Sequence, residues 1–469
     1  MSGRGHAVVI GGSIAGLLMA SVLSDVFESV TVYDRDLLPD KAEPRRGVPQ
    51  SRHAHALHGR GAEALGEVLP GFWDDMIDAG GVTGDAQVDV NWYLDGYQLA
   101  HAPSALTGMA LTRPTIELLI RRRAAALPNI KIAECVDVTG LITSGGRVTG
   151  VRIRPSGRDA LGDDPVDLPL PEPAEAEPVA ADLVVDTAGR GSRAAIWLGE
   201  LGFPVPRTSE VRADVSYVTR HYRSEPEQLG GMIGALVTPY PGLPRIGAAF
   251  RQEGSQWVVL LAGIVGEVPP TDDAGMLAFA ESLAGPEIAE VVRTSAPLDE
   301  PAKRRFPASV RYHYEKLDRY LDGFLVAGDA ICSFNPIYGQ GMTIAALEAV
   351  ALKHLIGGGD TADLPRRYFR TVGKLVSEAW TTSASGDLRF PEAEGKRGPA
   401  DRFINAYLEH FRKAASVDPV LGAAFLRVAN MIDSPTRLLS PGNAIRVFRS
   451  AGKAAPRVRQ RQPGVTAPG

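Results

Sequence analysis

The feature that most constrains the fold is a glycine-rich turn close to the amino terminus. Residues 7–10 have the pattern of a short apolar strand, residues 11–16 read Gly-Gly-Ser-Ile-Ala-Gly, and residues 17–23 have a helical pattern. Residues 30–33 predict a second strand, which ends at Asp34. This order is typical of a dinucleotide-binding βαβ unit, in which the helix dipole receives a pyrophosphate and the acid binds a ribose.

The residues of this turn have different predicted roles. Gly11 turns the chain, and Gly16 lets the helix pack closely against the strand. The usual middle glycine is replaced by Ser13, whose side chain must point away from the phosphates or hydrogen-bond to them if the backbone is to approach. Together with Ala15, these residues are candidate cofactor contacts.

A second informative stretch covers residues 325–343. An apolar strand ends in a Gly-Asp-Ala run that contains Asp329, and a helix from Met342 opens behind Pro336 and Gly341. The acid at the end of the strand can accept hydrogen bonds from a polyol, while the unpaired N–H groups of the helix face an electron-rich group. A ribityl chain and an isoalloxazine ring fit this pairing.

Four ordered motifs resemble those of a known family. They are the turn at 11–16, Asp34-Arg35, the segment 186–193 (Asp-Thr-Ala-Gly-Arg-Gly-Ser-Arg) and the block 328–343. In this order they resemble the single-component flavoprotein monooxygenases of the aromatic hydroxylase and squalene epoxidase superfamily, over roughly residues 1 to 360. The run from Arg45 to His55 further resembles the branch with bacterial polyene epoxidases.

The resemblance implies an α/β fold. It contains a discontinuous Rossmann-like FAD-binding domain of the glutathione-reductase type, an antiparallel β-sheet substrate domain and a C-terminal helical region. The implied division is FAD-binding parts at 1–75, 111–204 and 305–360, a substrate-facing excursion at 76–110, a substrate domain at 205–304, C-terminal helices at 361–450 and a disordered tail at 451–469.

The resemblance also assigns roles to single residues. Asp34 matches the acid that holds the adenosine ribose, Arg35 packs beside the adenine, and the backbone of Val136 meets the adenine. Asp329 matches the ribityl and pyrophosphate ligand, and Arg113 matches the arginine that opens a helix and reaches the cofactor. The remaining implied contacts are Arg46 at the flavin edge, Gln50, Pro336, and the backbone donors Gly341 and Met342.

The implied reaction is a monooxygenation, either an epoxidation or a hydroxylation, in which reduced FAD reacts with O2 to give a C4a-hydroperoxide. The ending Gly-Met-Thr, with Thr343, is similar to squalene epoxidases, and Cys332 replaces a histidine of many aromatic hydroxylases. The Gly-Met-Thr ending favours a lipophilic alkene, a small molecule from a natural-product pathway, as the substrate. With one glycine-rich fingerprint, we expect NAD(P)H to meet the flavin transiently, or a partner flavin reductase to supply reduced flavin.

Two other functions stay open from the residues alone. A redox-neutral FAD-containing cyclase of a polyketide pathway, performing a [4+2] addition, has the same architecture. Flavin reduction by NAD(P)H would favour oxygenation, whereas product formation without a reductant would favour cyclisation. A flavin-binding regulator without turnover is disfavoured by the large expected lid. The Trp-x-Trp-x-Ile-Pro signature of flavin halogenases is missing.

The histidines His53, His55 and His58 alternate in a way that metal ligands can. Their loop aligns with the flavin-edge segment of the resembled family, so we expect no metal there. For His55, a role as hydrogen-bond donor or proton shuttle near the flavin and a purely structural role both stay open.

Bulk properties favour a cytoplasmic enzyme. The chain has 469 residues and a net charge of −5, which gives no electrostatic reason for a nucleic-acid or anionic-membrane partner. The distant Cys135 and Cys332 suggest free thiols in a reducing compartment. The first residues run straight into a strand without room for a signal peptide, and the longest apolar candidate, 257–265, is too short for a membrane span.

Periodicity predicts further elements. The strand at 148–153 is expected to pair with residues 180–186, across a Pro-, Ala- and Glu-rich solvated loop at 155–180. Residues 205–300 predict an antiparallel sheet that covers the cofactor. Its expected strands are 215–220, 245–250 and 257–262, and the other expected elements are helices at 117–127, 274–283, 361–380 and 401–432 and a strand at 130–133.

Overall fold

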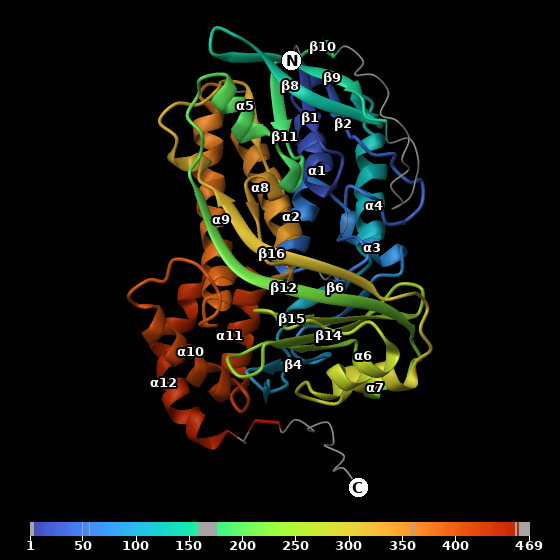
Figure 1. Ribbon diagram of the computed structural model, residues 1–469, viewed down its shortest axis with the longest axis vertical. Coiled ribbons are helices and arrows are strands. Elements are labelled where there is room, and N and C mark those ends of the chain that lie inside the picture. Colours follow the sequence, from blue (N-terminus) through green and yellow to red (C-terminus); the bar gives the residue numbers. More distant parts are fainter. Residues whose placement is uncertain are drawn as a thin grey trace.

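The computed structural model describes residues 4–48, 50–55, 57–157, 176–358, 361–454 and 457–458. Most of the predicted loop at 155–180 and most of the predicted tail at 451–469 lie outside these ranges. Figure 1 shows a parallel sheet with its helices in the upper part, a large antiparallel sheet below it, and a group of C-terminal helices beside that second sheet.

Within the described ranges, the parallel sheet has five strands in the order β17-β11-β1-β2-β7. The predicted strands at 7–10, 30–33 and 130–133 are confirmed as parts of β1, β2 and β7. The second halves of β1 and β2 are Val-rich and buried, as central parallel strands require, whereas β7 at the edge of the sheet is half-buried with Lys131 exposed. The bounds are β1 Arg4–Ile10, β2 Phe27–Tyr33, β7 Ile130–Ala133, β11 Leu183–Asp186 and β17 Phe324–Val326.

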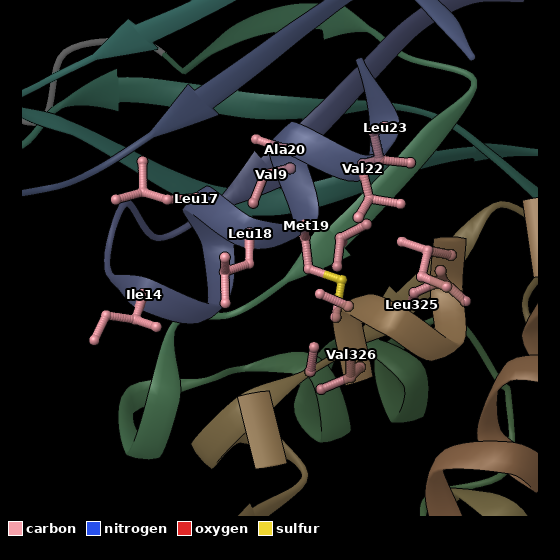
Figure 2. Close-up of a cluster of buried hydrophobic side chains, with 14 of the residues drawn as sticks. Val9, Ile14, Leu17, Leu18, Met19, Ala20, Val22, Leu23, Leu325 and Val326 are labelled. Atoms are coloured by element: carbon pink, nitrogen blue, oxygen red, sulfur yellow. The ribbon is translucent and has the colours of Figure 1, made fainter. Parts of the chain in front are cut away.

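Helix α1 (Ile14–Leu23) fills the centre of the upper core. It begins three residues earlier than predicted, directly after Ser13. Its side chains are buried nearly all round because it packs against β1 and lies between two other helices, α4 (Arg113–Ala125) and α8 (Gly341–Ile356). Figure 2 shows its apolar side chains in one cluster with Leu325 and Val326 of β17. Apolar burial therefore links the two cofactor-related segments.

A small antiparallel sheet of β8 (Val136–Ser144), β9 (Arg147–Pro155) and β10 (Glu177–Ala180) packs against β2 and β11. The predicted pairing of 148–153 with 180–186 is wrong for most of its length. Residues 177–180 pair with β9, whereas β11 pairs in parallel with β1 and β17. Strand β11 is apolar apart from its last residue, Asp186, and is better buried in the central sheet than at the edge of a small one.

The large antiparallel sheet has the described strands in the order β18-β16-β12-β15-β14-β13-β4-β5, with β13 and β4 parallel to each other. The strands predicted at 215–220, 245–250 and 257–262 are confirmed within β12, β14 and β15. Long β12 and β16 link the two sheets (Figure 1). The bounds are β4 Val90–Leu94, β5 Tyr97–Gln98, β12 Thr208–Arg223, β13 Gly234–Val237, β14 Arg245–Gln252, β15 Gln256–Gly263, β16 Ala302–Tyr312 and β18 Cys332–Ser333.

Two helices, α6 (Asp273–Glu281) and α7 (Glu287–Thr294), cover one face of this sheet around the buried Trp257. The expected domain boundary at 304/305 falls inside β16, and the excursion at 76–110 adds β4 and β5 to the sheet. The other described elements of the first 205 residues are β3 Val82–Asp85, β6 Thr107–Ala110, α2 Gly59–Val68, α3 Phe72–Asp78 and α5 Ala194–Glu200.

The C-terminal region starts with the long helix α9 (Leu364–Asp387), which extends the helix predicted at 361–380. The single helix predicted at 401–432 is wrong, because Asp418 caps a new helix there and accepts a hydrogen bond from the Val420 N–H. The result is α10 Asp401–Ala415, α11 Pro419–Ala429 and α12 Pro441–Ser450. Among the described helices, none combines the length and the apolarity needed to cross a membrane.

Candidate cofactor site at the edge of the parallel sheet

The predicted site residues lie at the carboxyl edge of the parallel sheet. Strand β1 leads into Gly11, β2 into Asp34, β11 into Thr187 and β17 into the turn with Asp329. Because neighbouring parallel strands end at the same edge, these four segments of the chain meet there. The backbone N–H of Val136, after β7, donates to the Asp34 carbonyl at 2.9 Å and brings the fifth strand to the same edge.

The glycine-rich turn needs glycine for its close packing. Gly11 has a φ of 101°, in the region that glycine favours, and its N–H donates to the Tyr33 carbonyl at 2.8 Å. A Cβ at Gly16 would overlap the Gly11 carbonyl and lie 2.7 Å from Thr187 Oγ1. The first turn of α1 can therefore lie directly on the end of β1, where its N–H groups have no intrahelical partner.

The hydroxyl group of Ser13 is bound to helix α4. It donates to Glu117 Oε2 at 2.6 Å and accepts a hydrogen bond from the Arg113 guanidinium at 3.0 Å. The side chain at the middle position is thereby held by protein groups, which leaves the backbone of the turn open. Arg113 and Glu117 also lie 3.8 Å apart as an i, i+4 pair on α4.

The carboxylate of Asp34 is buried, and each of its oxygens has a protein partner. Its Oδ2 accepts from the Gly12 N–H at 2.7 Å, its Oδ1 accepts from the Asp36 N–H at 2.9 Å, and Arg45 lies 3.3 Å away. Arg45 also pairs with Asp36 at 3.1 Å and with Glu117 at 2.8 Å. Sequence reasoning missed Arg45 as the buried link between the ribose-binding acid and helix α4.

These ion pairs set the charge states of the cluster. Burial opposes the charged form of Arg45, but the charges of Glu117, Asp34 and Asp36 raise its pKa overall. Burial likewise opposes ionisation of Glu117, but Arg45 and Arg113 hold its pKa below the ordinary value. Arg45 and Glu117 are therefore ionised at neutral pH and give this edge of the sheet a buried ion pair.

Asp329 lies where the turn after β17 meets the starts of α1 and α8. A Cβ at Gly341 would lie 3.9 Å from its Oδ1, and a Cβ at Gly189 would lie 3.8 Å from its Cβ. Burial raises the pKa of Asp329, while the charges of Arg113 and Arg190 oppose this shift. The side chain thus lies beside the start of α8 and the segment after β11, and a Cβ at the preceding Gly328 would lie 3.0 Å from the Ala15 Cβ of α1.

Glu348 is a second acid in this region, and sequence reasoning missed it. It is fully buried on α8, and its Oε2 accepts a hydrogen bond from the Gly328 N–H at 2.5 Å. Burial raises the pKa of Glu348 to about 8. The charge of Asp329 also raises this pKa, whereas the hydrogen bond from Gly328 lowers it in part. A lone acid in the apolar run from Ile344 to Leu352 is the signal that could have identified it.

The start of α8 leaves polar groups available for a ligand. Gln340 Oε1 and Thr343 Oγ1 are buried and have no hydrogen-bond partner in the part of the chain that the structure describes. The same holds for Arg113 Nε. Met342 is buried, and Gly339 before it has a φ of 65°. Unpartnered donors and acceptors beside an open helix N-terminus fit the predicted flavin nucleotide.

The remaining sequence-predicted residues lie around this edge. Arg35 is exposed, with its guanidinium 3.9 Å from the Cβ position of Gly191 in the segment after β11. Gln50 and Pro336 are half-buried, whereas Arg46 is exposed and its buried neighbour is Arg45. The flavin-edge role of Arg46 stays a prediction.

The histidine loop connects this edge to the large sheet. His53 bonds to Thr219 Oγ1 of β12 at 2.9 Å and packs edge-on against the Tyr217 ring at 4.5 Å. The Nδ1 of His55 bonds to the His53 carbonyl at 2.7 Å, and the Nε2 of His58 would lie 3.0 Å from a Cβ at Gly339. The three rings therefore have three different surroundings, and the described residues contain no cluster suited to a metal ion.

Burial keeps these rings neutral at neutral pH. It lowers the pKa of His53 and of His58 to about 4 and that of His55 to about 3. Nearby positive charge adds to the shift, from Arg304 for His53 and from Arg113 for His55. Neutral imidazoles can donate and accept hydrogen bonds at the junction of the cofactor edge and the sheet.

Comparison with known proteins gives one clear sequence relative. Protein Rv3254 of Mycobacterium tuberculosis is 33% identical over 442 residues, which span 92% of this chain and 90% of that protein. No protein-family model matches the chain.

Solved structures resemble it over nearly its whole length. The flavin-dependent brominase Bmp2 has a TM-score of 0.63 and 14% identity over 96% of this chain and 98% of that one. The p-nitrophenol 4-monooxygenase PnpA of Pseudomonas putida DLL-E4 has a TM-score of 0.61 and 17% identity over 93% of this chain and 100% of that one. The Diels-Alderase PyrE3 of the pyrroindomycin pathway has a TM-score of 0.57 and 17% identity over 91% of this chain and 80% of that one. The expected α/β fold is confirmed as that of flavin-dependent halogenases and monooxygenases.

Proposed function

The chain belongs to the family of the mycobacterial Protein Rv3254, and we propose that it is an FAD-dependent monooxygenase acting on a lipophilic natural-product intermediate. The observation that carries the proposal is the meeting of Asp34, Asp329 and the N-termini of α1 and α8 at one edge of the parallel sheet. This arrangement offers an acid to a ribose, N–H groups to a pyrophosphate and a second acid to a ribityl chain.

Each part of FAD has matching residues in this chain. Asp34 and the Val136 backbone would hold the adenosine, with Arg35 beside it. The first turn of α1 would bind the pyrophosphate, and Asp329 would accept hydrogen bonds from the ribityl hydroxyls. The buried polar atoms of Arg113, Gln340 and Thr343 without protein partners support a ligand at this place. The list of proposed contacts is Gly11, Ser13, Ala15, Gly16, Asp34, Arg35, Arg46, Gln50, Arg113, Val136, Asp329, Pro336, Gly341 and Met342.

Bound FAD would supply electron transfer from a nicotinamide and the activation of O2. The residues of this chain position the substrate and exclude water. An apolar cluster lies between the large sheet and the loop before α8, and it contains Val215 and Ile246, with Ile337 and Trp380 packed against it. A wall of this kind suits an apolar alkene better than a charged substrate.

We place the reaction nearest to that of the polyene epoxidase-like branch. The support is the likeness of the run from Arg45 to His55 to that branch, together with the likeness of the run from Gly341 to Thr343 to squalene epoxidases. Epoxidation by an activated flavin needs no protein base, so a site without an acid-base triad suffices. NAD(P)H would reduce the flavin at the surface, or a partner flavin reductase would deliver it reduced.

The structural likeness to the Diels-Alderase PyrE3 favours one alternative. In that case FAD would be a structural element, and the apolar surface beside the loop before α8 would fold a polyene for a redox-neutral [4+2] addition. The two functions differ in their need for a reductant, so one experiment separates them.

The test uses the purified full chain reconstituted with FAD. It is mixed without oxygen with NADH or NADPH while the flavin and nicotinamide absorbance bands are recorded, and isotopically labelled O2 and a polyene such as squalene are then added. Flavin bleaching followed by one labelled oxygen atom in the product supports the monooxygenase. A flavin that neither nicotinamide nor a flavin reductase can reduce contradicts it, and polyene conversion without a reductant selects the cyclase.

A further inference from the structure

A buried carboxyl group lies beside the proposed flavin loop and has no assigned role. Asp387, the last residue of α9, is 1% exposed. Its Oδ1 accepts hydrogen bonds from Asn335 Nδ2 at 2.9 Å and from the Tyr338 hydroxyl at 3.0 Å. Asn335 and Tyr338 flank Pro336 in the loop that leads to the start of α8. Asp387 therefore fixes the loop that presents Gly339 and Gly341 to the site.

The approach of α9 to this loop depends on a glycine. A Cβ at Gly386 would overlap the Tyr338 hydroxyl, so that hydroxyl can reach the neighbouring Asp387 only because residue 386 lacks a side chain. The bond joins residues 49 positions apart and holds the end of α9 against the cofactor loop.

The second oxygen of this carboxyl group points to a ligand. Asp387 Oδ2 is buried and has no hydrogen-bond partner among the residues that the structure describes. Burying a half-satisfied carboxyl group costs free energy, and native proteins usually satisfy such groups with water or a ligand. Burial raises the pKa of Asp387 to about 7, although the hydrogen bonds from Tyr338 and Asn335 lower it in part.

Two arginines complete the polar cluster. Asp95 Oδ2 lies 2.7 Å from Arg389 and 3.3 Å from Arg412, all with side chains at most 12% exposed. The charges of these arginines also act on Tyr338, where they oppose the raising of its pKa by burial and by Asp387. The titratable and charged groups around Asp387 are thus Tyr338, Arg389, Arg412 and Asp95.

This polar cluster adjoins apolar surface. Ala384 and Leu388, on either side of Asp387, belong to the buried cluster that includes Val215 of the large sheet, and Ile337 packs against it. A ligand that reached Asp387 Oδ2 would therefore be apolar over most of its surface and polar at one point.

We propose that Asp387, positioned by Tyr338, binds a hydroxyl group of the otherwise apolar substrate and thereby sets its orientation to the flavin loop. This inference rests on the proposed function and names the substrate class, a lipophilic alkene that carries an alcohol. An alcohol fits both charge states of the carboxyl group, because it can donate to the ionised form and accept from the protonated form. A carbonyl oxygen would fit only the protonated form.

The test compares alcohols with their methyl ethers. Calorimetric titration of the full FAD-loaded chain with farnesol and geranylgeraniol, and with their methyl ethers, measures binding without turnover. The expected result is that the alcohols bind about ten- to hundredfold more tightly than the ethers, that D387A loses this preference, and that D387N keeps part of it because its amide oxygen still accepts a hydrogen bond. Tyr338→Phe should weaken the preference partly, because it removes one of two bonds that orient the carboxyl group.

A matched control is Glu378→Gln, which changes an exposed acid on the same helix and should leave the preference intact. Between pH 6 and 8 the preference of the unaltered chain should change with the charge of Asp387, whereas D387N should show no such change. Thermal unfolding confirms that each variant is folded. Equal binding of alcohols and ethers, no binding of the alcohols, or an unaltered preference in folded D387A and D387N would overturn the proposal.

The bound FAD measured in the same samples separates this proposal from the proposed function. A chain that binds FAD and is reduced by NAD(P)H but shows no preference for alcohols refutes only the role of Asp387. A chain that fails to bind FAD refutes the proposed function itself.

Discussion

The Ser13 hydroxyl group donates a 2.6 Å hydrogen bond to Glu117, which ties the middle of the glycine-rich turn to helix α4. Glu117 in turn pairs with Arg45 at 2.8 Å, and Arg45 reaches Asp34. One acid on α4 thus supports both ends of the proposed adenosine and pyrophosphate site. The substitution of the usual glycine by serine is explained by this bond.

Removing this support should unfold or weaken the site. We expect Glu117→Ala to lower the free energy of unfolding by about 3–5 kcal/mol, because Arg45 and Arg113 would stay buried without their shared counter-charge. Glu117→Gln keeps an acceptor for Ser13 and should cost less. Denaturant unfolding measures both, and Glu63→Gln, an exposed acid of α2, is the control. An unchanged midpoint for Glu117→Ala would refute the supporting role.

Gly16 should not tolerate a methyl group. A Cβ there would overlap the Gly11 carbonyl, which belongs to the backbone and cannot rotate away. We expect Gly16→Ala to cost about 3 kcal/mol of stability and to lower the affinity for FAD. Gly66→Ala, within α2, adds its methyl group where no atom lies within 4 Å. That control should be neutral or stabilising by up to about 1 kcal/mol. Similar effects of the two substitutions would contradict this account.

Arg45 and Arg46 should behave differently although they are neighbours. Arg45→Ala leaves Asp34, Asp36 and Glu117 close together without their cation, so we expect a large loss of thermal stability. Arg46 is exposed, and Arg46→Ala should change stability by less than about 0.5 kcal/mol. If the predicted flavin-edge contact is correct, Arg46→Ala will still weaken FAD binding in a fluorescence titration. Unchanged affinity would remove Arg46 from the site.

Glu348 should make stability depend on pH above neutrality. Its pKa is about 8 in the folded chain and 4.5 ordinarily, so the folded state binds the proton more tightly between these values. Stability from this group is therefore greatest at low pH and falls as the pH rises towards 8. Glu348→Gln keeps an acceptor for the Gly328 N–H without the charge. We expect its melting temperature to fall less than that of the unaltered chain between pH 6.5 and 8.

Other groups act mainly at lower pH. His53, His55 and His58 have lowered pKa values, so they raise stability as the pH rises towards 6.5 and contribute little change above it. Asp387, with a pKa of about 7, contributes the same pH dependence of stability to the unaltered chain and to Glu348→Gln. The difference between the two melting curves therefore isolates Glu348. Parallel curves above pH 6.5 would show that Glu348 is not held protonated.

Local patterns predicted the central part of the fold. The run from Gly11 to Asp34 fixed its own strand, turn and helix, since each signal lies within a few residues of the next. The pairing partners of strands were harder to predict. Whether β11 pairs with β1 or with β9 depends on how the rest of the chain packs, not on the residues of β11 alone. The break at Asp418-Pro419 has a local signal, a helix cap followed by a first-turn proline.

The polar parts of the site could be predicted only in outline. Arg45 and Arg46 look alike in the sequence, and the acid that selects Arg45 comes from a helix 72 residues further along the chain. The contact of Tyr338 with Asp387 likewise joins separate segments and depends on a glycine whose importance appears only in three dimensions. Motif spacing in the sequence predicts which residues lie at the ends of neighbouring strands. It does not predict buried ion pairs, because these depend on how elements distant in the sequence pack together.

The central claim is that the turn at Gly11–Gly16 and the acid Asp329 hold one flavin nucleotide. The most direct measurement is equilibrium dialysis of the full chain against FAD, with Asp329→Ala compared in parallel and FMN as the competing ligand. We predict one FAD per chain, little binding of FMN, and an affinity at least tenfold weaker for Asp329→Ala, since a charge-assisted hydrogen bond contributes about 1.5–3 kcal/mol. A folded chain that retains no FAD, or an Asp329→Ala variant that binds it as tightly, would contradict the claim.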